Sequence, residues 1–275
     1  MRFRDRIGRV LRTFGGAMNG MVYDRLDAIE RHIEAIEPHL AQLQPDSLER
    51  YEMRVFRKFV RAGFSPTVIY DIGAADGVWS ADMHSIFPES RSHLFEPLAN
   101  HLPSYRASLD KVLPKFPSFT LHPVAVGAVT GQIQMTVHPE GYGSSVFHGG
   151  DWDQRPRIDL EGWTLDDYVA KHALAPPDLI KIDTQASEVL ILSHAKRALE
   201  HASMVFAETW FDKAYGPNTP LMTEVTELLE ASDFRLVEIG HKFYNTDHTL
   251  FGCDAFYLKR SLIPHYGTAM PAGPW

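Results

Sequence analysis

The sequence has a single cysteine, Cys253, among its 275 residues, which excludes an internal disulfide and any zinc site built from several cysteines. It also lacks an apolar run long enough to span a bilayer, and its first residues lack the apolar core and cleavage site of a secretory signal. Basic charge is not in excess, because the net charge is −8. These absences predict a cytoplasmic protein that does not bind long nucleic acid.

The N-terminal region, residues 1–45, differs in composition from the rest of the chain. Residues 1–14, "MRFRDRIGRVLRTF", combine five arginines with an apolar stripe at helical spacing, which predicts a basic amphipathic helix. Such a helix suits peripheral contact with the inner face of an anionic membrane, and a docking helix or a frayed terminus is the alternative. Residues 22–43 carry apolar residues at alternating steps of three and four. This coiled-coil pattern predicts a homo-oligomer, unless the helix packs on its own domain.

A second change of pattern follows a predicted linking helix over residues 46–65. From residue 66 to 262, strand-like runs such as "VIYDIG", "FTLHPVAVG" and "LIKID" alternate with helix-like segments such as 98–113 and 186–200. Alternation of this kind predicts an α/β fold with a mostly parallel sheet and helices on both faces. Residues 131–160 interrupt it and predict an inserted hairpin and lid, and residues 263–275 predict a flexible tail.

The stretch "YDIGAADG", residues 70–77, has the pattern of a strand that ends in a tight turn and enters a helix. The fingerprint of dinucleotide-binding turns needs one more glycine than Gly73 and Gly77 provide. Asp71 and Asp76 would repel a pyrophosphate, but they suit a ligand with a positive end. S-adenosylmethionine, with its sulfonium and ammonium groups, is such a ligand.

Two later strand ends support the same cofactor. "SHLFEP" places Glu96 about twenty residues beyond the turn, where its carboxylate can accept hydrogen bonds from both ribose hydroxyls. "VAVG", residues 124–127, is small and apolar enough to lie against an adenine ring. The order of these signals is more specific than any one of them, and an unrelated α/β fold with an acidic strand end is the alternative.

The chain resembles the FkbM-type methyltransferases, a family of class I S-adenosylmethionine-dependent enzymes. The resemblance rests on "DIGAADGVWS", "LFEPLANHLPSY", "PVAVGAVTGQI", "SSV", "WTLDDYV" and "LIKIDTQASEVLIL", in this order. It implies a Rossmann-like sheet of seven strands, with Asp71, Gly73 and Gly77 at the methionine end of the cofactor and Glu96 at the ribose. Together these signals predict cofactor contacts from Asp71, Gly73, Ala74, Asp76, Gly77, Ser80, Glu96, Pro97, Ala125 and Val126.

Three residues depart from the pattern of that family. The family usually has asparagine at the position of Ala75 and glycine at the position of Ala186, and Thr184 is also unusual. These departures concern the details of two turns, whereas the order of the motifs is retained.

The reacting groups are predicted at two neighbouring strand ends. In "LIKIDTQASE", Lys181 and Asp183 lie two apart on a strand and share a face, and "MVFAETW" ends in Glu208. Asp183 and Glu208 could share a divalent cation, magnesium or manganese, or one of them could act directly as a base. Glu188 and His148 are further candidates for catalysis. In the alternative interpretation Lys181 pairs with an acid and Glu188 braces a helix.

Methyl transfer to a hydroxyl of a sugar or glycan is the function that these features favour. O-methylation of a small secondary metabolite is the first alternative, and it leaves both N-terminal helices unexplained. A non-catalytic oligomeric binding module is the second alternative, although acids at three predicted strand ends argue against it.

Overall fold

The computed structural model describes residues 50–138, 141, 143–147 and 155–263. The predictions for residues 1–45, for the start of the linking helix, for His148 and for the tail beyond residue 263 fall outside these residues, so membrane contact and oligomerisation stay predictions. Within the described ranges, no helix has the length and apolar character needed to cross a bilayer.

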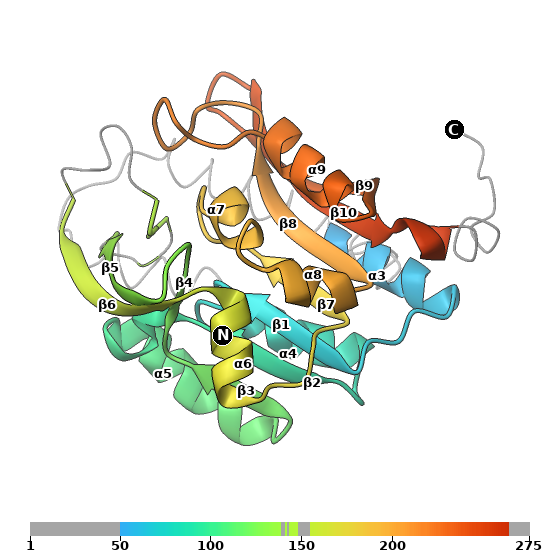
Figure 1. The fold of residues 1–275 in the computed structure, drawn as a ribbon, viewed down its shortest axis with the longest axis horizontal. Coiled ribbons are helices and arrows are strands. Elements are labelled where there is room, and N and C mark those ends of the chain that lie inside the picture. Colours follow the sequence, from blue (N-terminus) through green and yellow to red (C-terminus); the bar gives the residue numbers. More distant parts are fainter. Residues whose placement is uncertain (1–49, 139–140, 142, 148–154, 264–275) are drawn as a thin grey trace, which may run out of the picture. The chain divides into compact units, whose positions relative to one another are not determined.

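A seven-stranded sheet forms the centre of the described chain, in the order β3-β2-β1-β7-β8-β10-β9 (Figure 1). Its four pairings from β3 to β8 are parallel, and β10 runs antiparallel to both of its neighbours. The predicted, mostly parallel sheet of seven strands is therefore confirmed. The strands are β1 (Val68–Ile72), β2 (Arg91–Phe95), β3 (Phe119–His122), β7 (Leu179–Ile182), β8 (Met204–Trp210), β9 (Phe234–Tyr244) and β10 (Leu250–Lys259).

Helices cover both faces of this sheet, as predicted (Figure 1). Pro103 stands at the start of α5 and Pro97 at the start of η2, so the segment expected as one helix over 98–113 is divided. The segment 186–200 is likewise two helices. The helices are α3 (Tyr51–Arg61), α4 (Val78–Ile86), η2 (Pro97–Asn100), α5 (Pro103–Val112), η3 (Leu113–Lys115), α6 (Leu165–His172), α7 (Glu188–Leu192), α8 (Lys196–His201), α9 (Met222–Ala231) and η5 (Arg260–Leu262).

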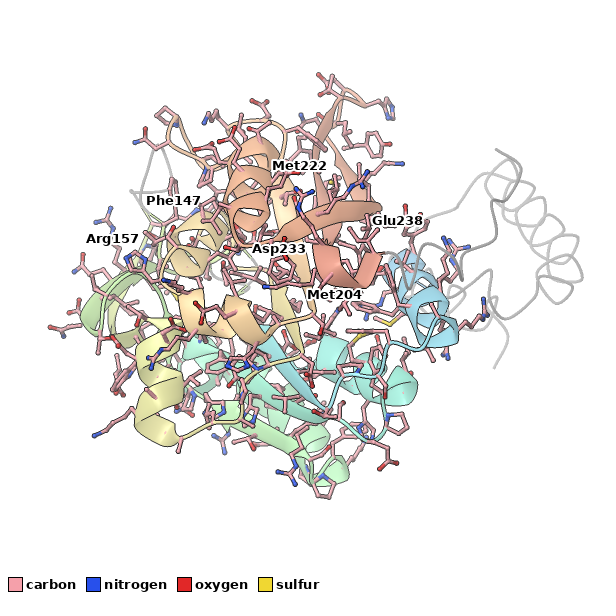
Figure 2. The ribbon with its side chains drawn as sticks, turned by 45° about the vertical axis from the view of Figure 1, so that its right-hand side comes forward. Phe147, Arg157, Met204, Met222, Asp233 and Glu238 are labelled. Carbon is pink, nitrogen blue, oxygen red and sulfur yellow. The ribbon has the colours of Figure 1, made fainter. Side chains whose placement is uncertain are left out.

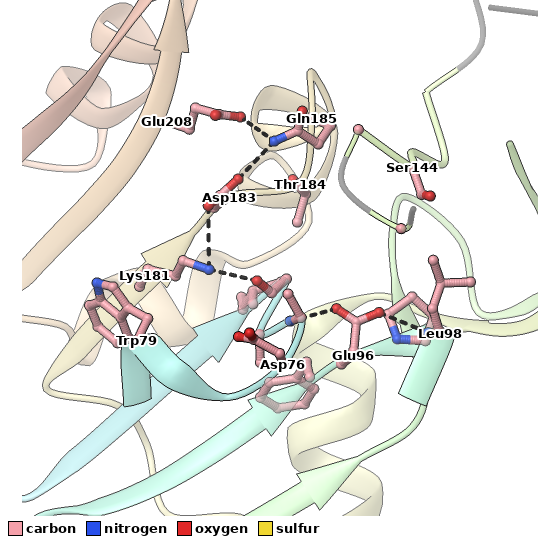
Figure 3. A pocket seen from close by; sticks show the side chains of 18 of the residues that line it. Asp76, Trp79, Glu96, Leu98, Ser144, Lys181, Asp183, Thr184, Gln185 and Glu208 are labelled. Atoms are coloured by element: carbon pink, nitrogen blue, oxygen red, sulfur yellow. Dashed lines mark hydrogen bonds and ion pairs between the residues drawn. The ribbon is translucent and has the colours of Figure 1, made fainter. Parts of the chain in front are cut away.

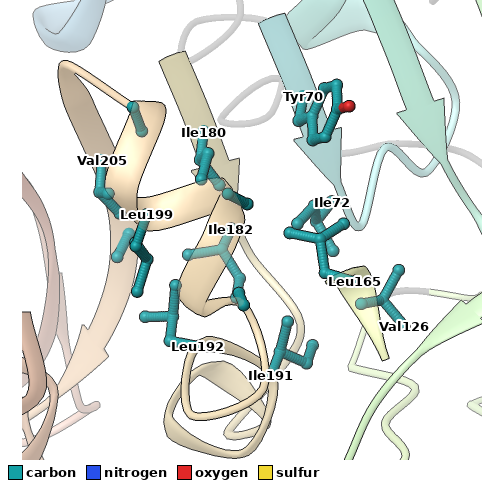
Figure 4. Close-up of a cluster of buried hydrophobic side chains, with 14 of the residues drawn as sticks. Tyr70, Ile72, Val126, Leu165, Ile180, Ile182, Ile191, Leu192, Leu199 and Val205 are labelled. Carbon is teal, nitrogen blue, oxygen red and sulfur yellow. The ribbon is translucent and has the colours of Figure 1, made fainter. Parts of the chain in front are cut away.

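Strand alternation divides the core between the two faces. In β1, Tyr70 and Ile72 join the cluster under α6, α7, α8 and α9, and Figure 4 shows both in this cluster with Ile182 and Leu192. Ile69 points the other way, into an aromatic cluster under α3 and α4. Figure 2 locates one methionine of each cluster, Met222 on α9 and Met204 on β8. The second face, beneath α3 and α4, is the one that carries the polar groups of the site.

The run "FTLHPVAVG" is not one strand, and this corrects the sequence interpretation. β3 ends at His122, and β4 (Ala125–Val126) belongs to a separate three-stranded sheet. Pro123 lacks the N–H that a continuous strand would donate. In the small sheet β4 pairs with β6 (Arg157–Trp163), which pairs antiparallel with β5 (Gly131–Thr136). Of this sheet, β5 and β6 therefore lie where an inserted hairpin was predicted, β6 extends three residues beyond residue 160, and β4 precedes the predicted region.

A buried chain of polar rings lies between β2, β3 and α6. His93 Nδ1 lies 2.9 Å from His122 Nε2, and His122 Nδ1 lies 3.0 Å from the hydroxyl of Tyr168. Burial, together with repulsion from His93 and His172, lowers the pKa of His122 from the ordinary histidine value of 6.5 to about 4. The folded state therefore requires His122 to be neutral.

Acid is expected to destabilise the protein through His122. The stabilisation that a neutral His122 contributes is complete above pH 6.5 and is lost as the pH falls toward about 4. In His122→Gln this proton-dependent loss should be absent, so its free energy of unfolding should vary less between these pH values than in the wild type. Urea unfolding at a series of pH values measures it, with His201→Gln at an exposed histidine as the control. Equal pH dependence in His122→Gln and the wild type would refute the assignment.

Candidate functional site

A cavity of about 430 Å³ opens at the carboxyl ends of β1, β2, β7 and β8 (Figure 3). The strand order reverses between β1 and β7, and open α/β sheets bind their ligands beyond the strand ends at such a point. The cavity has the volume of a small-molecule site. Of the predicted site residues, those that line it are Gly73, Ala74, Asp76, Glu96, Pro97, Ala125, Val126, Lys181, Asp183 and Glu208.

The turn after β1 needs a glycine at its first position. Gly73 has a φ of +80°, which side chains disfavour, and a Cβ there would lie 1.9 Å from the carbonyl oxygen of Asp183. The N–H groups of Gly73 and Ala74 both donate to the carbonyl of Phe95, at 3.0 and 3.2 Å. The turn is therefore fixed between the ends of β2 and β7, and its backbone forms part of the cavity wall.

Glu96 lies at the end of β2 with both carboxylate oxygens in use. Oε2 accepts from the N–H of Ala75 at 2.8 Å, and Oε1 accepts from the N–H of Leu98 at 2.8 Å. Burial raises the pKa of Glu96 to about 7, while these two N–H groups oppose the rise. Each oxygen keeps a second lone pair, so the carboxylate is held in place and can still accept from a ligand hydroxyl.

Lys181 is a buried cation that joins the ends of β1 and β7. Its Nζ donates to the carbonyl of Gly73 at 2.6 Å and lies 3.0 Å from Asp71 Oδ1 and 3.7 Å from Asp183 Oδ2. Burial lowers the pKa of Lys181, but Asp71 and Asp183 outweigh it, so that this pKa is raised overall. Lys181 therefore pairs with acids, as the alternative interpretation of the sequence had it.

Three predicted cofactor residues lie behind the cavity wall instead of lining it. Asp71 has no exposed surface, and its Oδ2 accepts from the Ser80 hydroxyl at 2.7 Å. Gly77 has a φ of +79°, and a Cβ there would meet Leu109 at 3.1 Å. The prediction that Asp71, Ser80 and Gly77 contact a ligand directly is thus corrected. Asp71 and Ser80 support Lys181, and Gly77 allows the chain to enter α4.

Asp183 and Glu208 face the cavity, but an amide stands between them. Gln185 Nε2 donates to Asp183 Oδ1 at 3.0 Å and to Glu208 Oε2 at 2.8 Å (Figure 3). Burial raises the pKa of Glu208 well above its usual value, and repulsion from Asp183, Glu188 and Asp254 adds to the rise. Within the described ranges, no group of three or more acids, histidines and cysteines could hold a metal ion. The geometry therefore does not support the predicted divalent cation between Asp183 and Glu208.

Glu188 braces the loop after β7 and does not line the cavity. It is buried at the start of α7, and its Oε1 accepts from the N–H of Thr184 at 2.8 Å and from the Thr184 hydroxyl at 3.1 Å. Burial raises the pKa of Glu188 to about 7, against these hydrogen bonds. The prediction of a direct catalytic role for Glu188 is thus corrected to a structural one.

Several cavity residues were missed from the sequence. Asp254 of β10 lies directly opposite Glu208 in the strand register, and Gln185 joins the two predicted acids. The pairing of β10 with β8 is not readable from one sequence. Gln185 was readable in part, because it follows Asp183 by two residues in the motif already singled out. The other polar and aromatic lining residues that were missed are Arg50, Glu52, Trp79, Phe95, Tyr105, Ser144, Thr184, Phe206 and Phe243.

The sequence matches the methyltransferase FkbM domain over residues 71–236. The chain belongs to the FkbM methyltransferase family. It is similar to the FkbM methyltransferase structure from Methylobacillus flagellatus, with 18% identity over 70% of this chain and 43% of that chain and a TM-score of 0.45. It thus spans less than half of that protein's length.

A second similar structure is the magnesium protoporphyrin IX methyltransferase of Synechocystis, solved with bound S-adenosylmethionine. Its identity is 7% over 76% of this chain and 79% of that chain, with a TM-score of 0.45. The sequence matches no curated protein. Membership of the FkbM family, a family of S-adenosylmethionine-dependent methyltransferases, therefore rests on the domain match.

The two alanines that depart from the FkbM pattern both adopt the left-handed conformation. Ala75 has a φ of 48° and Ala186 a φ of 74°. Asparagine and glycine, the residues usual in the family, are the ones that tolerate this region, which costs an ordinary residue roughly 1–2 kcal/mol. The departures therefore place backbone strain on both sides of the cavity.

Ala75→Asn is expected to stabilise the protein by about 0.5–1 kcal/mol, as it relieves part of this strain. The measurement is the melting temperature without ligand. Ala170→Asn, on an exposed position of α6, is the matched control and should lower the melting temperature, since asparagine is a weaker helix former than alanine. A fall of similar size in both variants would contradict the prediction.

Proposed function

We propose that the protein transfers a methyl group from S-adenosylmethionine to a hydroxyl of a sugar or glycan. The observation that carries the proposal is that one cavity joins Glu96 on one side to Asp183 and Glu208 on the other. A hydroxyl acceptor needs a group that takes its proton, and a buried carboxylate with a raised pKa, such as Glu208, is suited to this at neutral pH. The cofactor, when bound, supplies a methyl group activated by its sulfonium.

The residues at the β1 and β2 ends fit this cofactor. Glu96 offers lone pairs to vicinal hydroxyls, as a ribose needs, and Ala125, Val126 and Leu98 provide an apolar surface for a base. Gly73 brings backbone into the wall without a side chain, and Asp76 adds a carboxylate for a cationic group. These residues bind and orient, and much of the catalysis of methyl transfer is positioning.

The residues at the β7, β8 and β10 ends are proposed to receive the acceptor. Glu208 is the proton acceptor in this proposal, because Asp183 is already paired with Lys181. Asp254 lies opposite Glu208, and Trp79 and Phe243 line the same cavity. Carboxylates beside aromatic rings provide both hydrogen-bond acceptors and flat apolar faces. A sugar ring has partners for both, because its hydroxyls donate hydrogen bonds and its C–H faces pack on aromatic rings.

The test uses the full chain in two steps. Calorimetry with S-adenosylhomocysteine should give saturable binding, and folded protein that binds none would overturn the proposal. Labelled S-adenosylmethionine is then offered with sugars and glycan extracts, and in parallel with sugar-free alcohols. Methyl transfer to the sugars supports the proposal, whereas transfer to the sugar-free alcohols alone would favour a small-metabolite enzyme.

Glu96→Ala is expected to weaken S-adenosylhomocysteine binding roughly 10- to 100-fold, the loss typical of hydrogen bonds to a charged acceptor. The loss arises because the ribose acceptor disappears and because the N–H groups of Ala75 and Leu98 lose their partner. Glu89→Ala, at an exposed glutamate before β2, is the control and should leave the affinity unchanged. Wild-type affinity in Glu96→Ala would refute the ribose role.

A further inference from the structure

The side chain of Gln185 uses all of its hydrogen-bonding groups within the site. Its Nε2 carries two hydrogens, and they go to Asp183 Oδ1 at 3.0 Å and to Glu208 Oε2 at 2.8 Å. Its Oε1 accepts from the hydroxyl of Tyr215. One amide thus connects a carboxylate at the end of β7 with one on β8, and the connection is complete only in one orientation of the amide.

Tyr215 supports that orientation by donating to the amide oxygen. Burial raises the pKa of Tyr215, and the nearby carboxylates of Glu208, Glu188 and Asp183 raise it further, so its phenol keeps its proton. A neutral phenol next to an amide oxygen donates to it. If the amide turned over, its oxygen would face the carboxylates of Asp183 and Glu208, which repel it in their charged forms, and the Tyr215 hydroxyl would lose the amide oxygen to which it donates. Tyr215 is buried and packs edge-on against Trp210, so its hydroxyl has a fixed position.

The backbone at Gln185 is held in a costly conformation by contacts on its other side. Gln185 has a φ of 58° and Ala186 a φ of 74°, two successive non-glycine residues in the left-handed region. The hydroxyl of Ser145 lies 2.6 Å from the carbonyl of Gln185 and 3.0 Å from the hydroxyl of Ser187. Ser145 is itself bridged to Thr136 of β5. Strain of this kind persists where the surroundings over-determine the backbone, as they do here.

We propose that Gln185 is the positioning residue of the carboxylate pair. Its amide holds the carboxylates of Asp183 and Glu208 in place relative to each other at the cavity wall, and Tyr215 holds the amide of Gln185 in place. This inference rests on the proposed function, in which Glu208 takes the proton of the acceptor. Gln185 stabilises the charged form of Glu208 by donating to it. Its amide also stands between the carboxylates of Asp183 and Glu208, which would otherwise repel each other. Neither Gln185 nor Tyr215 needs to touch the reacting atoms.

The titration of Glu208 reports on this arrangement without any acceptor. The titratable groups that face Glu208 come from every element around it; they are Lys181, Asp183, Glu188, Asp254 and Tyr215, and all of them except Tyr215 remain in place in the variants below. In protein labelled with ¹³C at the glutamate carboxyl carbon, the signal of Glu208 is assigned by its loss in Glu208→Gln. Its midpoint is then compared between variants.

Tyr215→Phe keeps the ring and removes the hydroxyl that orients the amide. We expect Glu208 to bind its proton about tenfold more tightly, which is a midpoint one pH unit higher, because the amide no longer donates reliably to the charged form. Tyr257→Phe is the matched control, since it removes another buried tyrosine hydroxyl, bonded to Thr226 at 2.9 Å, away from the cavity. Its midpoint should equal that of the wild type.

Two substitutions of Gln185 itself complete the test. Gln185→Glu replaces the donor by an acceptor of equal size, and Gln185→Asn keeps an amide and tolerates the left-handed backbone but is one methylene too short for both carboxylates. Both should raise the midpoint. With a methylated acceptor in hand, kcat should fall at least about tenfold in Tyr215→Phe, with an unchanged KM for the cofactor and the acidic limb of the pH profile at higher pH.

An unchanged Glu208 midpoint in Tyr215→Phe and in both Gln185 variants would overturn the inference. Failure of the proposed function is seen separately, as absence of S-adenosylhomocysteine binding to the wild type. The carboxyl titration decides the positioning role in either case.

Discussion

Replacing Lys181 by methionine is expected to lower the free energy of unfolding by about 3–5 kcal/mol, the range measured when one partner of a buried ion pair is removed. Asp71 is fully buried, and it would keep only the Ser80 hydroxyl as a partner among those described here. The carbonyl of Gly73 would lose its donor at the same time. Urea unfolding at neutral pH measures the effect.

The double variant Asp71→Asn/Lys181→Met tells an unpaired charge from lost packing. Since the asparagine is neutral, the double variant should recover a large part of the stability that Lys181→Met loses. If it were instead as unstable as the sum of the two single variants, the ion pair would not be the source of the effect. Lys58→Met, at a half-exposed lysine paired with Glu238, should cost less than about 1 kcal/mol, as a surface ion pair does.

Gly73→Ala is expected to abolish S-adenosylhomocysteine binding. The added methyl would lie 1.9 Å from the carbonyl oxygen and 2.9 Å from the carbonyl carbon of Asp183, both backbone atoms that no rotamer change can move away. Relief requires the turn and the end of β7 to separate, which also moves the carbonyl that binds Lys181. Calorimetry should therefore show no saturable binding at concentrations that saturate the wild type.

Gly131→Ala is the matched control, which separates the effect of the steric clash at Gly73 from the effect of placing a side chain at a positive φ. Gly131 also has a positive φ, +148°, but a Cβ there meets nothing within 4 Å. Gly131→Ala should thus lower stability modestly and leave ligand affinity unchanged. If Gly73→Ala bound the ligand as the wild type does, the turn would not need its present approach to Asp183.

The fold was largely predictable because its signals are local. Short apolar runs alternate with amphipathic segments, and the strands β1, β2, β7 and β8 were readable within a few residues of their bounds. The run "FTLHPVAVG" is an exception, because Pro123 divides it and its second half pairs in another sheet. The sequence of an apolar run does not tell which of two sheets it pairs with, since each sheet offers an apolar strand as a partner.

The sequence by itself determined which groups stand at the strand ends, because a strand's last residues are set by the chain order alone. It therefore placed Glu96, Asp183 and Glu208 at the edge where the cavity opens. Only the tertiary structure decided how they are used. Asp71 turned inward to Lys181, since a face shared by β1 and β7 buries both. The pairing of β10 with β8 places Asp254 opposite Glu208, and the left-handed loop after β7 places the amide of Gln185 between Asp183 and Glu208. The sequence does not show these contacts, because they depend on strands far apart in the chain.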